Sequence, residues 1–217
     1  GQVLKAKKGA NSVLLTCTDG CMLKVSVVRD DIIRFQASLT NRFESSLPIE
    51  LGFVKDDFPV VPFVFDENLA LVTISTSVFT LEIQKSPFTM RLFDKEKHLT
   101  TQLDSSEGIK LGNQGNQLTF QMPNDEHFYG FGYMRSCFDA RGKKLTWKRD
   151  YRWNEATVPY FMSTRNYAFY SNNTWDHVFD FTSGNSNQNE NFTIENNGGA
   201  LDFYLLVGKD FKELLNT

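Results

Sequence analysis

Histidine and cysteine are scarce in this sequence, with three of each among 217 residues. The histidines, His98, His127 and His177, show none of the spacings that bind metal ions, and there is no G-x-S-x-G nucleophile motif. The cysteines form no C-x-x-C pair, which argues against a zinc or iron–sulfur site. We therefore expect no metal, no cofactor and no catalytic triad in this chain.

Basic residues are not in excess, and long apolar runs are absent. The formal net charge of −3 gives no electrostatic reason to expect nucleic acid or an anionic membrane as a partner. No apolar run approaches the roughly 20 residues that a membrane-spanning helix needs. No signal peptide is visible at the start of the chain, so cytoplasmic and secreted locations both stay open.

Strand-like alternation, by contrast, runs through the whole sequence. Aromatic residues make up 14% of it, with twenty Phe, which is typical of strands packed face to face. Short alternating or β-rich runs are separated by Asp, Asn, Gly and Pro turn signals. The runs cover 13–18, 21–28, 31–38, 60–65, 69–76, 78–84, 88–94, 117–122, 159–163, 166–171, 176–181 and 200–207. They predict an all-β fold, a sandwich or barrel of antiparallel sheets.

The first hairpin bears on the cysteines. Asp19-Gly20 is a strong signal for a two-residue hairpin turn between 13–18 and 21–28. In that register Cys17 faces Met22, so Cys17 and Cys21 lie on opposite faces of the ribbon. We therefore expect no disulfide between them, and predict buried free thiols.

Two stretches near the end depart from the strand pattern. Residues 182–199 are rich in Asn, Ser and Gly and predict a long exposed loop or hairpin tip. Residues 210–217 predict the only helix, with Asp210 placed to cap it. The sequence stops after about one and a half turns of that helix, and so short a helix is marginal in water. We therefore expect a sandwich domain over 1–207, and over 208–217 the start of a connection to a further domain.

Residues 128–133 and 147–153 concentrate glycine, aromatic rings and charge. Gly130 and Gly132 alternate with aromatic residues, and glycine within a strand often marks close approach by another backbone or a ligand. In 147–153, Trp and Tyr are mixed with Lys, Arg and Asp. Sugars are bound by such mixtures, because their apolar faces stack on aromatic rings and their hydroxyls bond to charged groups. A cation–π and salt-bridged surface loop is the alternative.

Another possible chemistry is sugar epimerisation of the mutarotase type. It needs two imidazoles and a carboxylate around the anomeric carbon for general acid–base catalysis. His127 and His177, with Glu126 or Glu195, are the available groups, although nothing in the sequence brings them together.

Four blocks of the sequence resemble a known family. They are FYGFG at 128–132, RGKKLTWKRD at 141–150, VPYFMSTRNYAFY at 158–170 and GGALDFYLLVG at 198–208. In this order they resemble the N-terminal domain of glycoside hydrolase family 31, the α-glucosidase and α-xylosidase family. The resemblance implies a galactose-mutarotase-like β-sandwich, and the terminal KDFKELLNT is similar to the lead into that family's catalytic (β/α)8 barrel.

The resemblance also implies how the chain takes part in catalysis. The family uses a retaining mechanism whose two catalytic aspartates lie on the barrel, so no catalytic residue is expected here and the chain alone should be inactive. Its N-terminal domain lends a loop that binds the α-linked oligosaccharide through the Asp of a W-N-x-D segment. Asp150 matches that Asp and Trp147 the Trp, while Arg152 and Trp153 match positions that tune selectivity. The stretch 128–132 is interpreted as structural, a strand packed against the neighbouring domain.

Three blocks depart from the family pattern. Tyr133 stands where Glu commonly follows F-Y-G-x-G, Lys148 replaces the Asn of W-N-x-D, and 165–168 lacks both glycines of R-G-Y-G. An α-glucosyltransferase, or an enzyme for an unusual α-linkage, is therefore as compatible with the sequence as a plain α-glucosidase. A stand-alone carbohydrate-binding module is the remaining alternative.

Overall fold

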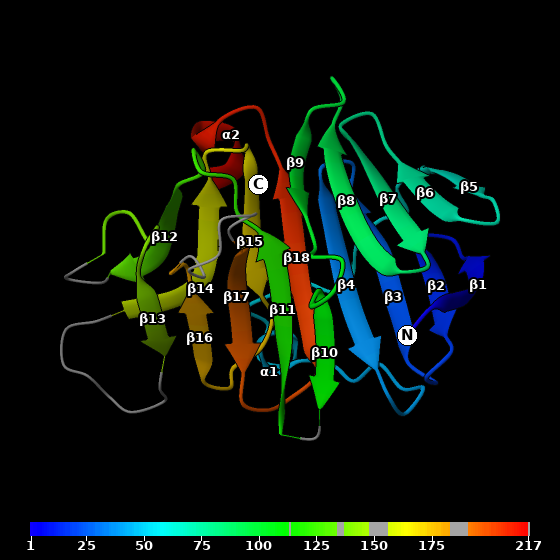
Figure 1. Cartoon of the computed structure of the whole chain (residues 1–217), viewed down its shortest axis with the longest axis horizontal. Helices are drawn as coiled ribbons and strands as arrows, with labels where there is room; N and C mark the ends of the chain where they lie inside the picture. The colour runs from blue at the N-terminus through cyan, green and yellow to red at the C-terminus, as the bar shows by residue number, and fades with distance from the viewer. Residues whose placement is uncertain (113, 134–136, 148–155, 183–190, 217) are drawn as a thin grey trace.

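The computed structural model describes residues 1–112, 114–133, 137–147, 156–182 and 191–216. These residues form short strands and two short helices (Figure 1). The strands are β1 Val3–Lys8, β2 Ser12–Cys17, β3 Met22–Arg29, β4 Ile32–Ser38, β5 Val64–Glu67, β6 Leu71–Ser75, β7 Phe79–Lys85, β8 Phe88–Asp94, β9 Leu99–Gln102, β10 Ile109–Gly112, β11 Gly115–Gln121, β12 Phe128–Tyr133, β13 Lys144–Trp147, β14 Ala156–Ser163, β15 Tyr167–Ser171, β16 His177–Asp180, β17 Asn191–Asn196 and β18 Leu201–Val207; the helices are α1 Leu47–Glu50 and α2 Phe211–Leu215. In this part of the chain, neither helix is long and apolar enough to cross a membrane.

The strands form a sandwich of antiparallel sheets, as predicted. One layer is an eight-stranded sheet in the order β1-β2-β3-β4-β18-β15-β14-β12. The other contains two five-stranded sheets, β10-β11-β17-β16-β13 and β5-β6-β7-β8-β9. A bridge between Leu103 and Phe120 joins these two smaller sheets, and the layers overlap in the view of Figure 1.

Phenylalanine side chains fill the space between the layers. Phe161 of β14 is completely buried and lies at the centre of the aromatic cluster. Its ring stacks on Phe169 of the same sheet at 5.4 Å between centroids, and meets the edge of Phe192 from the opposite sheet at 5.9 Å. Phe192 stacks in turn on Phe120 at 5.2 Å. Because successive strand residues point to opposite faces, the period-two pattern directs these rings inward.

The outer face of the eight-stranded sheet is covered as well. Tyr204 and Leu206 of β18 pack there against Val54, Phe58 and helix α2. Every residue of β18 is consequently buried, although alternate side chains point to opposite faces. This explains why 201–207 reads as a nearly continuous apolar run.

A buried ion pair lies on this covered face. The guanidinium of Arg34 donates two hydrogen bonds to Asp202, from Nε to Oδ1 at 2.9 Å and from Nη2 to Oδ2 at 2.7 Å. Asn172 adds a third, from Nδ2 to Oδ2 at 2.8 Å, and the Arg34 side chain lies over the Tyr204 ring at 5.4 Å. Asp56 binds Arg34 from the solvent side, with about half of its side chain exposed. Asn172 is therefore buried and bonded to the ion pair.

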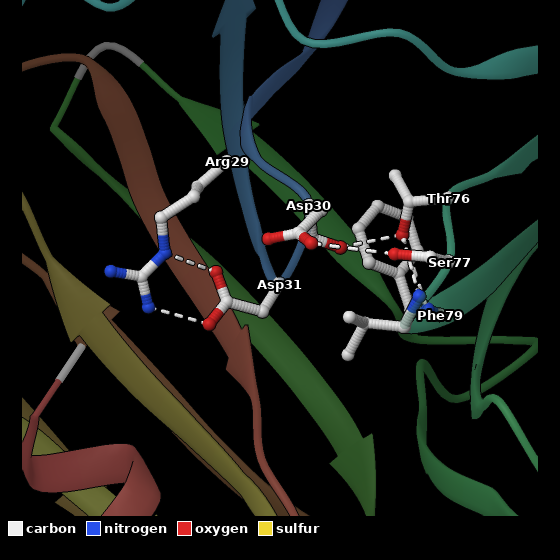
Figure 2. A network of polar contacts seen from close by, with 7 residues as sticks. Arg29, Asp30, Asp31, Thr76, Ser77 and Phe79 are labelled. Carbon is white, nitrogen blue, oxygen red and sulfur yellow. Dashed lines mark hydrogen bonds and ion pairs between the residues drawn. The ribbon is translucent and has the colours of Figure 1, made fainter.

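Turns from the two layers are joined by a second polar network, shown in Figure 2. Thr76, in the turn between β6 and β7, donates from Oγ1 to the backbone carbonyl of Asp30 at 2.5 Å. Ser77 donates to the Asp30 carboxylate at 3.3 Å. Beside them, the Arg29 guanidinium pairs with both carboxylate oxygens of Asp31. The β3–β4 turn of one sheet is thereby fixed to the β6–β7 turn of the other (Figure 2).

The predicted register of the first hairpin is wrong. Thr16 pairs with Met22, so the turn contains three residues, 18–20, and Cys17 lies opposite Cys21. Gly20 has φ of 80° and its amide donates to the Cys17 carbonyl at 3.1 Å, the geometry of a turn followed by a glycine bulge. The cysteines are free thiols, but they lie on the same face of the ribbon rather than on opposite faces.

Other predictions near the ends of elements also differ from the structure. Residues 191–196, expected in an exposed loop, form β17 inside a sheet, because Phe192 and Ile194 are buried in the core. The run at 60–65 becomes a strand only over 64–67, and α1 is a helix that the sequence did not predict. The terminal helix is confirmed as α2, where Asp210 Oδ1 accepts from the Glu213 amide at 2.8 Å.

A buried carboxyl group precedes β12. Glu126 is 1% exposed, and Ser163 Oγ donates to its Oε1 at 2.5 Å. Burial is the main cause that raises the pKa of Glu126 from 4.5 to about 7. Since the folded pKa lies above the unfolded one, the contribution of Glu126 to the free energy of unfolding is fully present below pH 4.5 and is lost as the pH rises through about 7.

We expect Glu126→Gln to remove this pH dependence. The amide keeps an oxygen that accepts from Ser163 but does not ionise. The variant should therefore be more stable than the parent at pH 8 to 9, by roughly 3 kcal/mol if the full pKa difference is expressed, and nearly equal to it at pH 4 to 5. Urea unfolding of both proteins across this range measures the difference. A gap that stays constant with pH would contradict the argument.

Candidate functional site

A cavity of about 310 Å³ opens where β13, β15 and the turn before β16 meet. Aromatic, amide and carboxylate side chains line it together, and they come from segments far apart in the sequence. They include Trp147, Tyr170, Asn173, Trp175, Asp176 and His177. The combination of indole and phenol rings with a few polar groups is typical of small-molecule sites, and the volume lies at their lower end.

His177 fixes the geometry beneath this pocket. Its Nδ1 donates to the carbonyl of Trp175 at 2.6 Å, so its Nε2 is the acceptor for Ser171 Oγ at 2.7 Å. Burial lowers the pKa of His177 to about 4, which keeps the imidazole neutral at neutral pH. The edge of Trp147 meets the imidazole at 5.9 Å between ring centroids. One neutral histidine therefore contacts both tryptophans of the pocket.

The Trp175 indole packs against the backbone of two glycines. A Cβ built on Gly198 would lie 2.5 Å from Cε3 of Trp175, and one on Gly199 would lie 2.7 Å from its Cδ1. The Asn173 carboxamide accepts from the Trp175 amide at 2.8 Å and donates to the Gly198 and Ala200 carbonyls at 3.0 Å each. With 45% of its surface exposed, Trp175 presents a fixed aromatic surface at the pocket.

Trp147 is one of the four predicted site residues, and it lies at the pocket. It ends β13, pairs with His177 across the ladder and is half-buried. The other three, Asp150, Arg152 and Trp153, lie outside the described residues. They belong to the segment that joins the end of β13 to the start of β14, so the pocket marks the point from which that segment departs.

The FYGFG stretch has a structural role in this domain. Phe128 and Phe131 are completely buried in the aromatic cluster. Gly130 has φ of 137° and pairs with Phe161, after which the register shifts by a bulge. Contact between this strand and another domain stays a prediction.

The two histidines needed for an epimerase have separate environments. His127 Nδ1 lies 2.6 Å from the Asp139 carboxylate, beside the start of β12. His177 lies across from Trp147, at the opposite end of the β13–β16 ladder from Lys144. Glu126 is bonded to Ser163 and not to either imidazole. Within the described residues, the arrangement that acid–base catalysis at an anomeric carbon requires is not formed.

One group of potential metal ligands lies away from the pocket. Asp94, Glu96 and His98 lie close together in the exposed turn between β8 and β9. Asp94 Oδ1 already accepts from the backbone amides of Glu96 and His98 at 2.9 Å each, which is an ordinary turn interaction. The cluster therefore has a structural explanation.

The fold and sequence match characterised glycosidases. A family model described as the glycosyl hydrolase 31 N-terminal galactose mutarotase-like domain covers residues 22–180. The chain belongs to glycoside hydrolase family 31. A curated relative, alpha-glucosidase 2 of Bacillus thermoamyloliquefaciens, is 30% identical in an alignment of 213 positions that covers 92% of this chain and 26% of the relative. The chain thus spans about a quarter of the length of that enzyme.

Solved structures of family 31 enzymes share the same sandwich. A dextranase from Flavobacterium johnsoniae, solved with isomaltotriose, superimposes with a TM-score of 0.83 at 22% identity, over 99% of this chain and 27% of the enzyme. A cycloalternan-forming enzyme from Listeria monocytogenes, solved with a pentasaccharide, gives 0.77 at 21% identity over 96% of this chain and 21% of the enzyme. At this identity the likeness establishes the fold, a galactose-mutarotase-like β-sandwich.

Sequence reasoning missed Trp175. The signal that points to it is Gly198-Gly199, quoted above only as part of a family block. The two glycines pack against the indole, and this becomes visible only when the turn before β16 meets the turn before β18.

Proposed function

We propose that this family 31 domain completes the substrate site of a retaining α-glycosidase or α-glucosyltransferase that acts on α-linked oligosaccharides. The catalytic aspartates then lie on a (β/α)8 barrel outside residues 1–217. The domain contributes the segment after Trp147, with Asp150 as a hydrogen-bond acceptor for sugar hydroxyls. The observation that supports this proposal is the pocket at the end of β13, where Trp147, Trp175 and Asp176 line one cavity.

The chemistry of the pocket favours a sugar. Indole rings stack on the apolar faces of a pyranose, and carboxylate and amide groups bond to its hydroxyls. The rings are held in place before any ligand binds, Trp175 by Asn173 and the glycines and Trp147 by its contact with His177. A preorganised site loses less conformational entropy on binding. The relatives also favour α-linked glucans, since one is an alpha-glucosidase and a dextranase neighbour was solved with isomaltotriose.

Asp150→Ala in the full-length enzyme tests the contribution of the loop. If the carboxylate bonds to sugar hydroxyls in the transition state, the loss should be about 1–3 kcal/mol, or roughly 5- to 150-fold in kcat/KM. Steady-state kinetics on an aryl α-glucoside and an aryl α-xyloside measure it. Asp66→Ala, an exposed aspartate of β5, is the control and should leave kcat/KM unchanged. A large fall in melting temperature with unchanged kinetics would instead assign Asp150 a structural role.

Trp175→Ala tests the pocket separately from the loop. Stacking a sugar ring on the exposed part of this indole would bury apolar surface worth about 1–2 kcal/mol, so we expect a loss of roughly 5- to 30-fold in oligosaccharide affinity. Binding to the intact enzyme is measured by calorimetry. Phe138→Ala removes another exposed aromatic ring, which does not line the pocket, and should have no effect on affinity. Equal losses from both variants would rule out a specific site.

The same experiments separate the enzyme from a stand-alone binding module. If the protein is an enzyme, its longer polypeptide hydrolyses or transfers α-glycosides. A module binds the oligosaccharide without turnover. Assay of the intact protein on aryl α-glycosides decides between them, and a mass spectrum of the expressed protein shows whether a barrel is present.

A further inference from the structure

Cys17 and Cys21 form a cross-strand pair at the end of the β2–β3 hairpin. The Cys17 amide donates to the Cys21 carbonyl at 2.9 Å, which continues the ladder in which Thr16 pairs with Met22. Residues paired directly across antiparallel strands place their side chains on the same face. We infer that Cys17 and Cys21 are a dithiol site that oxidises to an intrachain disulfide.

The position of the pair in the ladder implies the spacing that a disulfide needs. Hydrogen-bonded antiparallel pairs have a Cα–Cα distance of about 5.5 Å, and disulfides span about 4.4–6.8 Å. The turn is held by its own contacts, since the Asp19 carboxylate accepts from the Cys21 amide at 3.1 Å and the Gly20 amide donates to the Cys17 carbonyl at 3.1 Å. The hairpin therefore presents the two cysteines to each other without rearrangement of the backbone.

The two thiols form a hydrogen bond with each other and line a surface cavity. A side-chain hydrogen bond from Cys21 is the main cause that lowers the pKa of Cys17, and the same bond raises the pKa of Cys21. A thiolate at Cys17 is thus stabilised by the thiol that it would join. Both cysteines line a cavity of about 120 Å³ with Leu23, Phe88 and Ile109. Cys17 is buried, and Cys21 is partly exposed.

The reaction is thiol–disulfide exchange with a small disulfide such as glutathione disulfide. One cysteine thiolate attacks a sulfur of the reagent, which forms a mixed disulfide and releases one glutathione thiolate. The second cysteine then attacks the protein sulfur of the mixed disulfide and displaces the other glutathione. Two protein thiols are oxidised, one glutathione disulfide is reduced, and the two thiol protons end on the two glutathione molecules.

Peptide mapping of the full-length protein tests the inference. Trypsin cleaves after Lys8 and Lys24, so both cysteines fall in the peptide 9–24, whereas Cys137 falls in 136–141. The folded protein is incubated with glutathione disulfide, denatured, alkylated and digested. We expect peptide 9–24 to lack two hydrogens and to resist alkylation until it is reduced, while the Cys137 peptide does not form this internal bond.

Two variants make the result specific to the register. Cys21→Ser should convert the product to a mixed disulfide with glutathione or to an alkylated Cys17. Adding Met22→Cys to that variant places a thiol one residue further along, on the other face of the ribbon, so an internal bond should not form in the folded protein. The inference would be overturned if both cysteines of the parent protein could still be alkylated after incubation with glutathione disulfide. It would also be overturned if the Met22→Cys variant formed the internal disulfide as readily as the parent.

Discussion

Replacing Asp202 with alanine is expected to lower the free energy of unfolding by about 3–5 kcal/mol. Asp202 is 4% exposed and accepts two hydrogen bonds from Arg34 and one from Asn172. The substitution removes the buried carboxylate and leaves the 6% exposed Arg34 inside the outer-face packing with only the half-exposed Asp56 as its counter-charge. The cost arises mainly from the group left behind and not from the intrinsic value of the ion pair.

Asp56→Ala is the matched control. Asp56 pairs with the same guanidinium, but half of its side chain is exposed, so water replaces much of what is lost. Its removal should cost at most about 1 kcal/mol. Urea unfolding of the two variants and the parent measures how much the free energy of unfolding falls when Arg34 loses its buried partner or its exposed one. If the two substitutions cost the same, burial does not determine the energy of this network.

Strands with one buried face were predictable from the sequence because their pattern is local. In β7, Phe79, Leu81 and Ile83 point inward and alternate with partly exposed residues, so the hydrophobic period determines both the strand and its register. The family resemblance agreed with this pattern and supplied the topology, which periodicity alone does not give.

The sequence predicted less well where a distant contact decides the local structure. Residues 191–196 are mostly polar, yet they form a strand because Phe192 stacks on Phe120 of β11 and on Phe181, which follows β16. The amino-acid composition of 191–196 does not reveal these contacts with rings outside the segment. The predicted exposed loop was wrong over these residues for that reason.

The length of the first hairpin turn decides how the two cysteines are interpreted. Asp19-Gly20 is compatible both with a two-residue turn and with the last two positions of a three-residue turn. The structure has the second, and this moves Cys21 from the face opposite Cys17 to the same face. The interpretation of the cysteines changes with it, from two separated thiols to a pair.

The candidate site was predicted in part. Trp147 was identified from its own segment and lines the pocket beside other polar and aromatic groups, while its role in binding a sugar stays a prediction. Trp175 was missed because the pairing of β13 with β16 brings it to the pocket that Trp147 also lines. In that pairing Trp147 lies opposite His177, 30 positions away, and no local motif records it. The roles of Asp150, Arg152 and Trp153 stay predictions.

Gly130→Ala is expected to cost at least about 3 kcal/mol, which makes it the substitution that best tests the structural role of FYGFG. Gly130 has φ of 137°, which residues other than glycine rarely adopt. A Cβ there would lie 2.7 Å from the carbonyl oxygen of Tyr160 and 3.0 Å from Cα of Phe161. Both are backbone atoms of the paired strand, so the clash can be relieved only by moving β14 away from β12, beside the centre of the aromatic core.

Gly142→Ala separates the clash from the backbone strain. Gly142 also has a positive φ, of 74°, but a Cβ there would meet no atom within 4 Å. That variant should lose only the conformational preference for glycine, about 1–2 kcal/mol. Thermal melts and urea unfolding measure the loss of stability in each variant. The difference between the two losses is the cost of the clash with β14. If Gly130→Ala lowered sugar binding but cost no more stability than Gly142→Ala, the close approach at Gly130 would serve a ligand and FYGFG would belong to the binding site. If stability alone falls, the glycine is there because two strands must pass close to each other under the phenylalanine cluster.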